Sequence, residues 1–188
     1  SSATSRRPLG NLLSRMPLAD LNLPSRLLAG GGPGSPDPRV RRAMAAPVIG
    51  QFDPDFTAIM DDVMELAREA FMTRNVRCFP VSGLASAGLE AFLNTLIEPG
   101  DQVAISGGPV FVAETSDIAG RYGAVVVPFE GTSPTLVIAS GPNVRNLASA
   151  AHAGGARVVV EATPALGAVE LRVDDWGIDA CVAGVDHA

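Results

Sequence analysis

Lysine is absent from the 188 residues of the chain, and all 14 basic residues are arginines. Chemistry that depends on a side-chain amine, such as an imine link to a cofactor or phosphate binding by a loop lysine, is therefore excluded within these residues. Acidic residues outnumber basic ones, since 20 of them give a net charge of −6. A nucleic-acid partner is not expected, because surfaces that follow a phosphate backbone are basic.

Histidine and cysteine are limited to two residues each. His152 falls within an expected helix and His187 is the penultimate residue, so the two lack the spacing of metal ligands and no metal is expected. Cys78 and Cys181 lie in apolar runs that we interpret as strands, which predicts buried, reduced thiols in a cytoplasmic protein. A nucleophilic cysteine–histidine pair is the less favoured alternative, because neither cysteine is surrounded by a catalytic signature.

Long apolar runs are missing as well. The longest uncharged run covers the 14 residues 131–144 and is broken by Pro134 and Pro142, so it is too short to span a bilayer. With 47% apolar and 18% charged residues, the composition predicts a soluble globular protein that buries a core without a disulfide or a metal. We therefore expect no membrane association and a cytoplasmic location.

Proline and glycine divide the chain into two parts. Residues 1–28 contain three prolines, and we interpret them as an extended N-terminal arm that lies on another surface, with a disordered tail as the open alternative. A run of glycines and prolines at residues 30–36 predicts a loop with demanding backbone geometry. Residues 29–188 are expected to form one domain.

Helical periodicity is clearest between residues 54 and 71. Asp53 and Pro54 have the pattern of an N-cap followed by a first-turn proline, and apolar residues then recur at intervals of three and four. We expect the Met and Phe side chains of this helix to pack in the core rather than bind a ligand.

From residue 77 onward, short runs rich in Val and Ile alternate with helical segments. Strands of this kind are typical of a sheet that is buried on both sides. The sequence therefore predicts an α/β domain with a mostly parallel sheet and helices on both faces. The expected strands are residues 78–81, 102–106, 124–128, 135–139, 157–161 and 179–183, and the expected helices are residues 86–97, 111–122 and 143–153.

Two positions of this pattern are candidates for binding. The turn at residues 82–86 joins a strand to a helix, where backbone amides and the Ser86 hydroxyl could hold a phosphate. The alternative is that Ser86 only caps the helix. Glu161 ends an apolar strand at the edge where open α/β sheets place their ligands. Its alternative role is to cap the turn at residues 162–164.

Six ordered blocks of the sequence resemble one known family. They are Leu27–Ser35, Pro47–Pro54, Phe79–Gly83 with Leu89–Ala91, Glu98–Asp101, Asp117–Ile118 with Arg121–Ala124, and Trp176–Asp179. Together they are similar to the class V, fold-type I aminotransferases that depend on pyridoxal phosphate (PLP), close to the alanine–glyoxylate and serine–pyruvate group. The resemblance implies the large, cofactor-binding domain of that fold, and it implies that the family's C-terminal small domain is absent.

The resemblance also implies a set of cofactor-binding positions. The phosphate turn falls on Leu84, Ala85 and Ser86, where Leu84 and Ala85 replace a hydroxyl residue and a glycine. Phe111 falls where an aromatic ring stacks on the pyridine. Glu161 falls where an Asp pairs with the pyridine nitrogen. PLP is therefore a possible cofactor, with binding that is expected to be weakened or lost.

The family's covalent attachment point for the cofactor falls on His187, which stands in place of the lysine. An imidazole can move a proton but cannot form the imine link. The resemblance also implies that the helix between the strands at 124–128 and 135–139 is deleted.

These features leave three hypotheses. The chain is expected to form a homo- or hetero-oligomer such as a dimer. The favoured hypothesis is a non-catalytic, aminotransferase-like subunit that pairs with a full-length PLP-dependent homologue. In the second, the chain is an enzyme, an aminotransferase or a lyase or dehydratase, that binds PLP non-covalently and uses His187 as the base. In the third, the chain is one half of a split aminotransferase.

Overall fold

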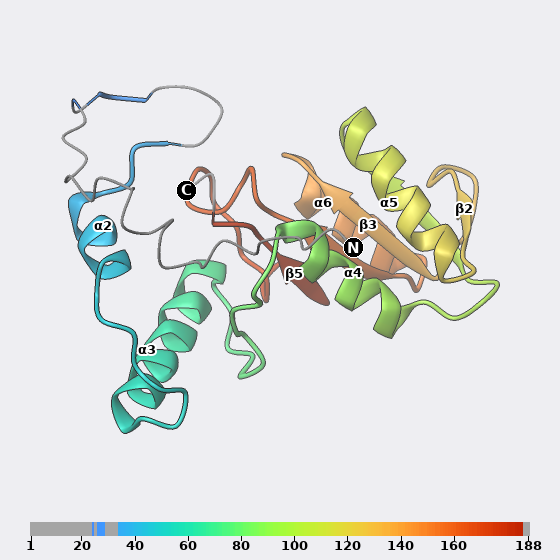
Figure 1. Ribbon diagram of the computed structural model, residues 1–188. Coiled ribbons are helices and arrows are strands. Elements are labelled where there is room, and N and C mark those ends of the chain that lie inside the picture. The colour runs from blue at the N-terminus through green and yellow to red at the C-terminus, as the bar shows by residue number, and fades with distance from the viewer. Residues whose placement is uncertain (1–23, 25, 29–33, 186–188) are drawn as a thin grey trace, which may run out of the picture.

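The computed structural model describes residues 24, 26–28 and 34–185. Most of the predicted N-terminal arm, most of the glycine run and His187 lie outside these residues. The described part consists of an α/β body and two helices that lie to one side of it (Figure 1).

The body is built on a five-stranded sheet in which all strands run parallel, in the order β2-β1-β3-β4-β5. The predicted α/β class and mostly parallel sheet are therefore confirmed. The strands are β1 (Gln102–Ser106), β2 (Val125–Val127), β3 (Leu136–Ser140), β4 (Arg157–Glu161) and β5 (Ala180–Val182).

The two faces of the sheet have separate cores, because successive side chains of a strand point to opposite faces. In β3, Leu136 and Ile138 pack with helices α4 (Ala85–Leu96) and α5 (Pro109–Arg121). Val137 and Ala139 point the other way and pack with helix α6 (Val144–Ala153). Helix α4 lies in front of the strands and α6 behind them (Figure 1), as predicted for a sheet covered on both faces.

The order of the strands determines where the chain changes direction. After β1 the chain moves outward through α5 to β2, and it then returns past β1 to form β3 and continue the other way. The return, residues 128–135, contains no helix. Parallel sheets bind ligands outside the carboxyl ends of the strands near such a change of direction.

Helix α3 (Pro54–Phe71) has the predicted start, since the Asp53 carboxylate accepts a hydrogen bond from the Asp55 amide. The expectation that its Met and Phe residues pack in the core is wrong. None of the 18 residues of α3 is buried, although Phe71 at its end packs partly against the core behind the sheet. The periodic apolar face exists, but the body does not cover it. Helix α2 (Pro38–Met44) precedes it and also has no buried residue.

The predicted strand at residues 78–81 is also wrong. These residues form neither helix nor strand, and the side chains of Phe79 and Val81 are exposed. Pro80 has no backbone amide to donate within a sheet, which opposes a strand at this position. The other predicted strands and helices are present, with ends that differ from the prediction by no more than two residues. None of the helices in the described ranges is long and apolar enough to cross a membrane.

Candidate functional site

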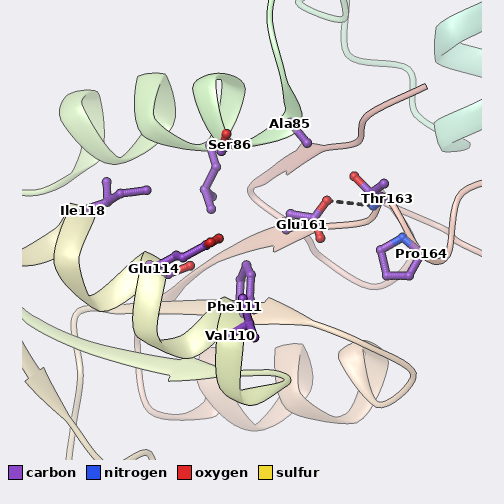
Figure 2. Close-up of a pocket in the computed structure, with 11 residues that line it drawn as sticks. Ala85, Ser86, Val110, Phe111, Glu114, Ile118, Glu161, Thr163 and Pro164 are labelled. Carbon is purple, nitrogen blue, oxygen red and sulfur yellow. Dashed lines mark hydrogen bonds between the residues drawn. The ribbon is translucent and has the colours of Figure 1, made fainter. Parts of the chain in front are cut away.

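A cavity of about 570 Å³ opens between α4 and α5 at the carboxyl end of β4 (Figure 2). Its walls are mainly apolar and aromatic, with a few polar groups, as in most small-molecule sites. The residues that line it are Ala85, Ser86, Leu89, Val110, Phe111, Glu114, Thr115, Ile118, Glu161, Thr163 and Pro164.

Four of the five predicted site residues meet in this cavity. Ala85 and Ser86 approach it from the start of α4, Phe111 from the first turns of α5, and Glu161 from the end of β4. Up to 76 residues of sequence separate them, and the parallel sheet brings them to one edge. The fifth residue, His187, lies outside the described residues.

Glu161 is held in place by two hydrogen bonds. The Ser140 hydroxyl donates to one carboxylate oxygen (Oε2) at 3.1 Å, and the Thr163 amide donates to the other (Oε1) at 3.0 Å. The second bond is the turn-capping role expected as the alternative, so Glu161 both caps the turn and faces the cavity. An ionised carboxylate has about four acceptor positions, so each oxygen can accept a further bond from a ligand.

The Phe111 ring can take its position because the residue that it packs against, Gly107, has no side chain. A Cβ atom on Gly107 would lie 2.5 Å from the Phe111 Cδ1 atom and 3.3 Å from the Ser140 carbonyl oxygen. Only a residue without a side chain leaves room for the ring there. The half-buried ring forms one wall of the cavity.

The alternative expectation that Ser86 caps helix α4 is wrong. Leu84, not Ser86, is the N-cap residue, and no side chain caps this helix end. The Leu84 carbonyl accepts the first bonds, from the Ala87 and Gly88 amides. The first amides of a helix lack partners within the helix and favour an anion. Ser86 lies in the first turn beside them, with its side chain exposed.

Glu114 and Thr163 are among the lining residues that were not predicted from the sequence. Glu114 lies three residues after Phe111, so the helix predicted at 111–122 already places both residues on one face. An exposed carboxylate on a helix does not by itself indicate a binding site. Thr163 follows β4, and its hydroxyl oxygen accepts a hydrogen bond of 2.8 Å from the Gly184 amide. This bond ties the segment after β5 to the edge of the cavity.

The cysteines do not form part of the site. Both are free thiols, as predicted, and both are partly buried. Burial raises the pKa of the Cys181 thiol to about 12, with smaller contributions from Glu161 and Cys78. Burial also raises the pKa of Cys78. Thiols protonated at neutral pH are poor nucleophiles, in agreement with a structural role.

Within the described ranges, no group of three or more Cys, His, Asp or Glu residues could hold a metal. His152 pairs instead with Asp179, whose carboxylate lies 3.0 Å from the imidazole Nε2 and accepts a 2.7 Å bond from the Val158 amide. This pair lies where β4 and β5 begin, at the opposite end of the strands from the cavity.

Comparison with known proteins places this chain in a family. No family model matches the chain. Over 190 aligned residues, which cover 88% of this chain, it is 36% identical to the (S)-ureidoglycine–glyoxylate transaminase of Bacillus subtilis. It is 31% identical to the alanine–glyoxylate aminotransferase of Drosophila melanogaster over 87% of this chain.

The chain is a homologue of the class V, PLP-dependent aminotransferases. The crystal structure of the Bacillus subtilis ureidoglycine–glyoxylate aminotransferase matches 89% of it with a TM-score of 0.79 and 35% identity. An alanine–glyoxylate aminotransferase from Nostoc sp. matches 90% with a TM-score of 0.76 and 29% identity. The fold is therefore that of the large domain of fold-type I aminotransferases.

The homology covers only part of the relatives. The chain spans 46% and 48% of the two curated transaminases and 50% and 52% of the two crystal structures. These 188 residues thus correspond to about half of an aminotransferase chain of this family.

The cavity fits the ring of PLP better than its phosphate. Phe111 offers an aromatic face and Glu161 a carboxylate with free acceptor positions, and both suit a protonated pyridine ring. At the phosphate end, the cavity has helix amides and the Ser86 hydroxyl but no basic side chain among its lining residues. Glu114 adds a second carboxylate to the same cavity, which opposes a phosphate by like-charge repulsion. The described lining residues therefore offer more contacts to the ring of PLP than to its phosphate.

Proposed function

We propose that this chain is a non-catalytic, aminotransferase-like subunit that pairs with a full-length PLP-dependent homologue. The observation that carries the proposal is the uncovered apolar face of α3. Ile59, Val63 and Leu66 follow one another at helical spacing, and their side chains are 52%, 39% and 63% exposed. An apolar helix face of this length is stabilised by burial, and in the described residues no element of the body covers it.

Neighbouring residues enlarge the apolar surface. Met44 at the end of α2 and Phe52 just before α3 are 80% and 91% exposed. The contacts of α3 with the body are at its C-terminal end, where the Val173 amide donates to the Phe71 carbonyl and the Asp174 carboxylate accepts from Thr73 and Arg74. The rest of the helix extends away from the sheet (Figure 1), in a position suited to contact another subunit.

The chemistry of the chain supports a non-catalytic role. These residues include no lysine for a covalent link to the cofactor, and no basic side chain lines the cavity. A partner that carries its own lysine and its own cofactor would keep the activity, while this chain contributes an interface.

Native mass spectrometry of the protein purified from its own host tests the proposal, because it reports partner masses and bound cofactor together. We expect a complex with a larger homologue, with the mass of PLP on that larger chain. A protein that is monomeric at micromolar concentration would contradict the proposal.

The second candidate function is a PLP-dependent enzyme with His187 as the base. It is favoured by the meeting of Phe111 and Glu161 in one cavity. It predicts a homo-oligomer that carries the cofactor on this chain, and its activity would be lost in a His187→Ala variant. An unchanged activity in that variant would exclude it.

A further inference from the structure

Helices α2 and α3 carry opposite charges. Helix α3 contains five acidic residues and one arginine, whereas α2 contains three arginines and no acidic residue. Both helices lie to one side of the α/β body, and neither has a buried residue (Figure 1). The ion pairs of the described residues include none of the five carboxylates of α3, and of the arginines of α2 they include only Arg39. Most of the charge on the two helices is therefore not neutralised within the part of the chain that the structure describes.

The carboxylates of α3 are arranged along its apolar face. Asp55, Asp62 and Glu69 are exposed and follow one another at intervals of seven residues, so they form one row along the helix, which we call the acidic row. Asp62 lies three residues after Ile59 and four residues before Leu66, and residues at these spacings are neighbours on a helix. The acidic row thus borders the exposed apolar face along its length.

Helix α2 has the complementary pattern. Val40 and Met44 are four residues apart and lie on one side of the helix, where their side chains are 48% and 80% exposed. Arg41 lies three residues before Met44 and borders that side. An exposed apolar edge next to positive charge matches an apolar face next to negative charge, because both the apolar contact and the charges are then favourable.

A second copy of the chain can supply α2 to the apolar face of α3. The hydrogen bonds and ion pairs of the described residues do not join α2 to α3 of the same chain. Contact between the α3 helices of two copies is disfavoured, because in a two-fold pair the same side of each helix meets its counterpart and the acidic rows would repel each other. Contact of α2 with α3 occurs twice in such a pair, since each copy offers both helices.

We propose that two copies of this chain pair reciprocally, with α2 of each copy lying on the apolar face of α3 of the other. Val40 and Met44 cover that face, and Arg41 lies against the acidic row. This pairing is a property of the chain alone and goes beyond the proposed function. A full-length homologue and a second copy use the same face of α3, so the homologue replaces the second copy rather than adding to the pair.

Sedimentation velocity of the purified full chain, without any homologue, tests the pairing. At low salt and micromolar concentration we expect a species with twice the mass of the chain. Raising the salt concentration from about 0.05 M to about 0.5 M should weaken the pair, because the attraction between the charges is screened over a shorter distance. A chain that is monomeric at low salt would overturn this inference but not the proposed function, which native mass spectrometry tests separately.

An exchange of charges between the two helices tests the reciprocal contact. Arg41→Glu and Asp62→Arg should each weaken self-association by about tenfold or more, because each variant brings like charges together in both contacts of the pair. An equal mixture of the two variants should pair as the wild type does, because α2 of each variant then matches α3 of the other. Recovery in the mixture also shows that both variants are folded. A mixture that pairs no better than the separate variants would overturn the inference.

Matched controls change the residue next to each tested position. Arg42→Glu lies on the opposite side of α2 from Val40, and Asp61→Arg lies on the opposite side of α3 from Ile59, since two residues correspond to about half a helical turn. Each control makes the same change in net charge as its test variant, and both should self-associate as the wild type does. An equal loss in controls and test variants would show that net charge governs the association, and it would contradict the reciprocal contact.

Discussion

The position of the Phe111 ring in the cavity depends on the absence of a Cβ atom at Gly107. A Gly107→Ala variant would place a Cβ atom 2.5 Å from the Phe111 ring, so the ring must turn into the cavity. We expect a loss of about 1–3 kcal/mol in the free energy of unfolding, as for other overpacked sites. Urea unfolding measures the loss.

The control for this variant is another glycine of the same region. Gly120 lies within α5, and a Cβ atom there would meet nothing within 4 Å. Gly120→Ala should therefore stabilise the protein by about 0.4–1 kcal/mol. If both variants change stability in the same direction, the contact between Gly107 and Phe111 is not what determines the outcome.

Cys181 gives a prediction about pH. The pKa of its thiol is about 12 in the folded protein against an ordinary value of 9.0. Because the folded-state pKa is the higher one, its contribution to stability is complete below about pH 9 and is lost as the pH rises toward 12. Unfolding measured between pH 8 and pH 11 should show this loss in the wild type and a smaller one in Cys181→Ala.

The reactivity of the same thiol offers a second measurement of that prediction. At pH 8, iodoacetamide should modify Cys181 only after the protein is unfolded, because the folded thiol is buried and protonated. Rapid modification of Cys181 in the native protein would contradict the burial that raises its pKa.

At the scale of elements, helix α3 allows the most specific test of the proposed pairing. Ile59→Glu places a charge in the centre of its apolar face, and the side chain is already 52% exposed, so we expect a change in stability of less than about 0.5 kcal/mol. The proposed pairing with a larger homologue should be lost in native mass spectrometry. Thr57→Glu adds the same charge two residues before Ile59, nearly on the opposite side of the helix, and should leave pairing intact.

The Asp174 carboxylate accepts two of the hydrogen bonds that attach the end of α3 to the body. A hydrogen bond from the Thr73 hydroxyl, followed by one from the Arg74 amide, lowers the pKa of Asp174 below its ordinary value of 3.8. Because the folded-state pKa is the lower one, the contribution to stability is present above pH 3.8 and is lost as the pH falls below it. Hydrogen exchange at the end of α3 should increase in acid, and Asp174→Asn should show that increase already at pH 7.

The helices and strands that the sequence predicted best are those whose packing contacts all come from this chain. Strands β1 and β4 have the expected bounds, because residues buried on both faces form continuous apolar runs. The apolar run at residues 78–81 resembles these strands in local sequence, but in the described residues it pairs with no strand. Helix α3 shows the same limit, since its periodicity reveals an apolar face without revealing whether this chain or another covers it.

The residues of the candidate site likewise divide into those that the sequence predicts and those that only the structure reveals. Ser86 and Glu161 could be predicted because each begins or follows a regular element at the carboxyl edge of the sheet, whereas Phe111 could be predicted only from the resemblance to the family. Glu114 could not, because acidic residues are common on exposed helix faces and only the packing of α4 beside α5 reveals the cavity. The support of Phe111 by Gly107 likewise depends on a contact between backbone and ring that no periodicity encodes.

At the scale of the whole molecule, the absence of lysine makes the organisation easy to test by limited proteolysis, because trypsin can cut only after arginine. Arg74 and Arg77 lie in the stretch between α3 and α4, which has no helix or strand, whereas Arg145 lies in α6 and Arg157 in β4. We expect the first cuts at Arg74 and Arg77, which leave the α/β body intact. Mass spectrometry of the fragments identifies the sites, and early cuts at Arg145 or Arg157 would contradict this division.

The hydrogen bonds between the end of α3 and Asp174 join residues about 100 positions apart in the chain. A ribosome that adds about 5–20 residues per second needs roughly 5–20 s to make that stretch. During this time α3 has been synthesised, but the residue that anchors its end to the body has not. Throughout this interval its apolar face is accessible to chaperones or to another nascent chain, so that assembly with a partner can begin during translation.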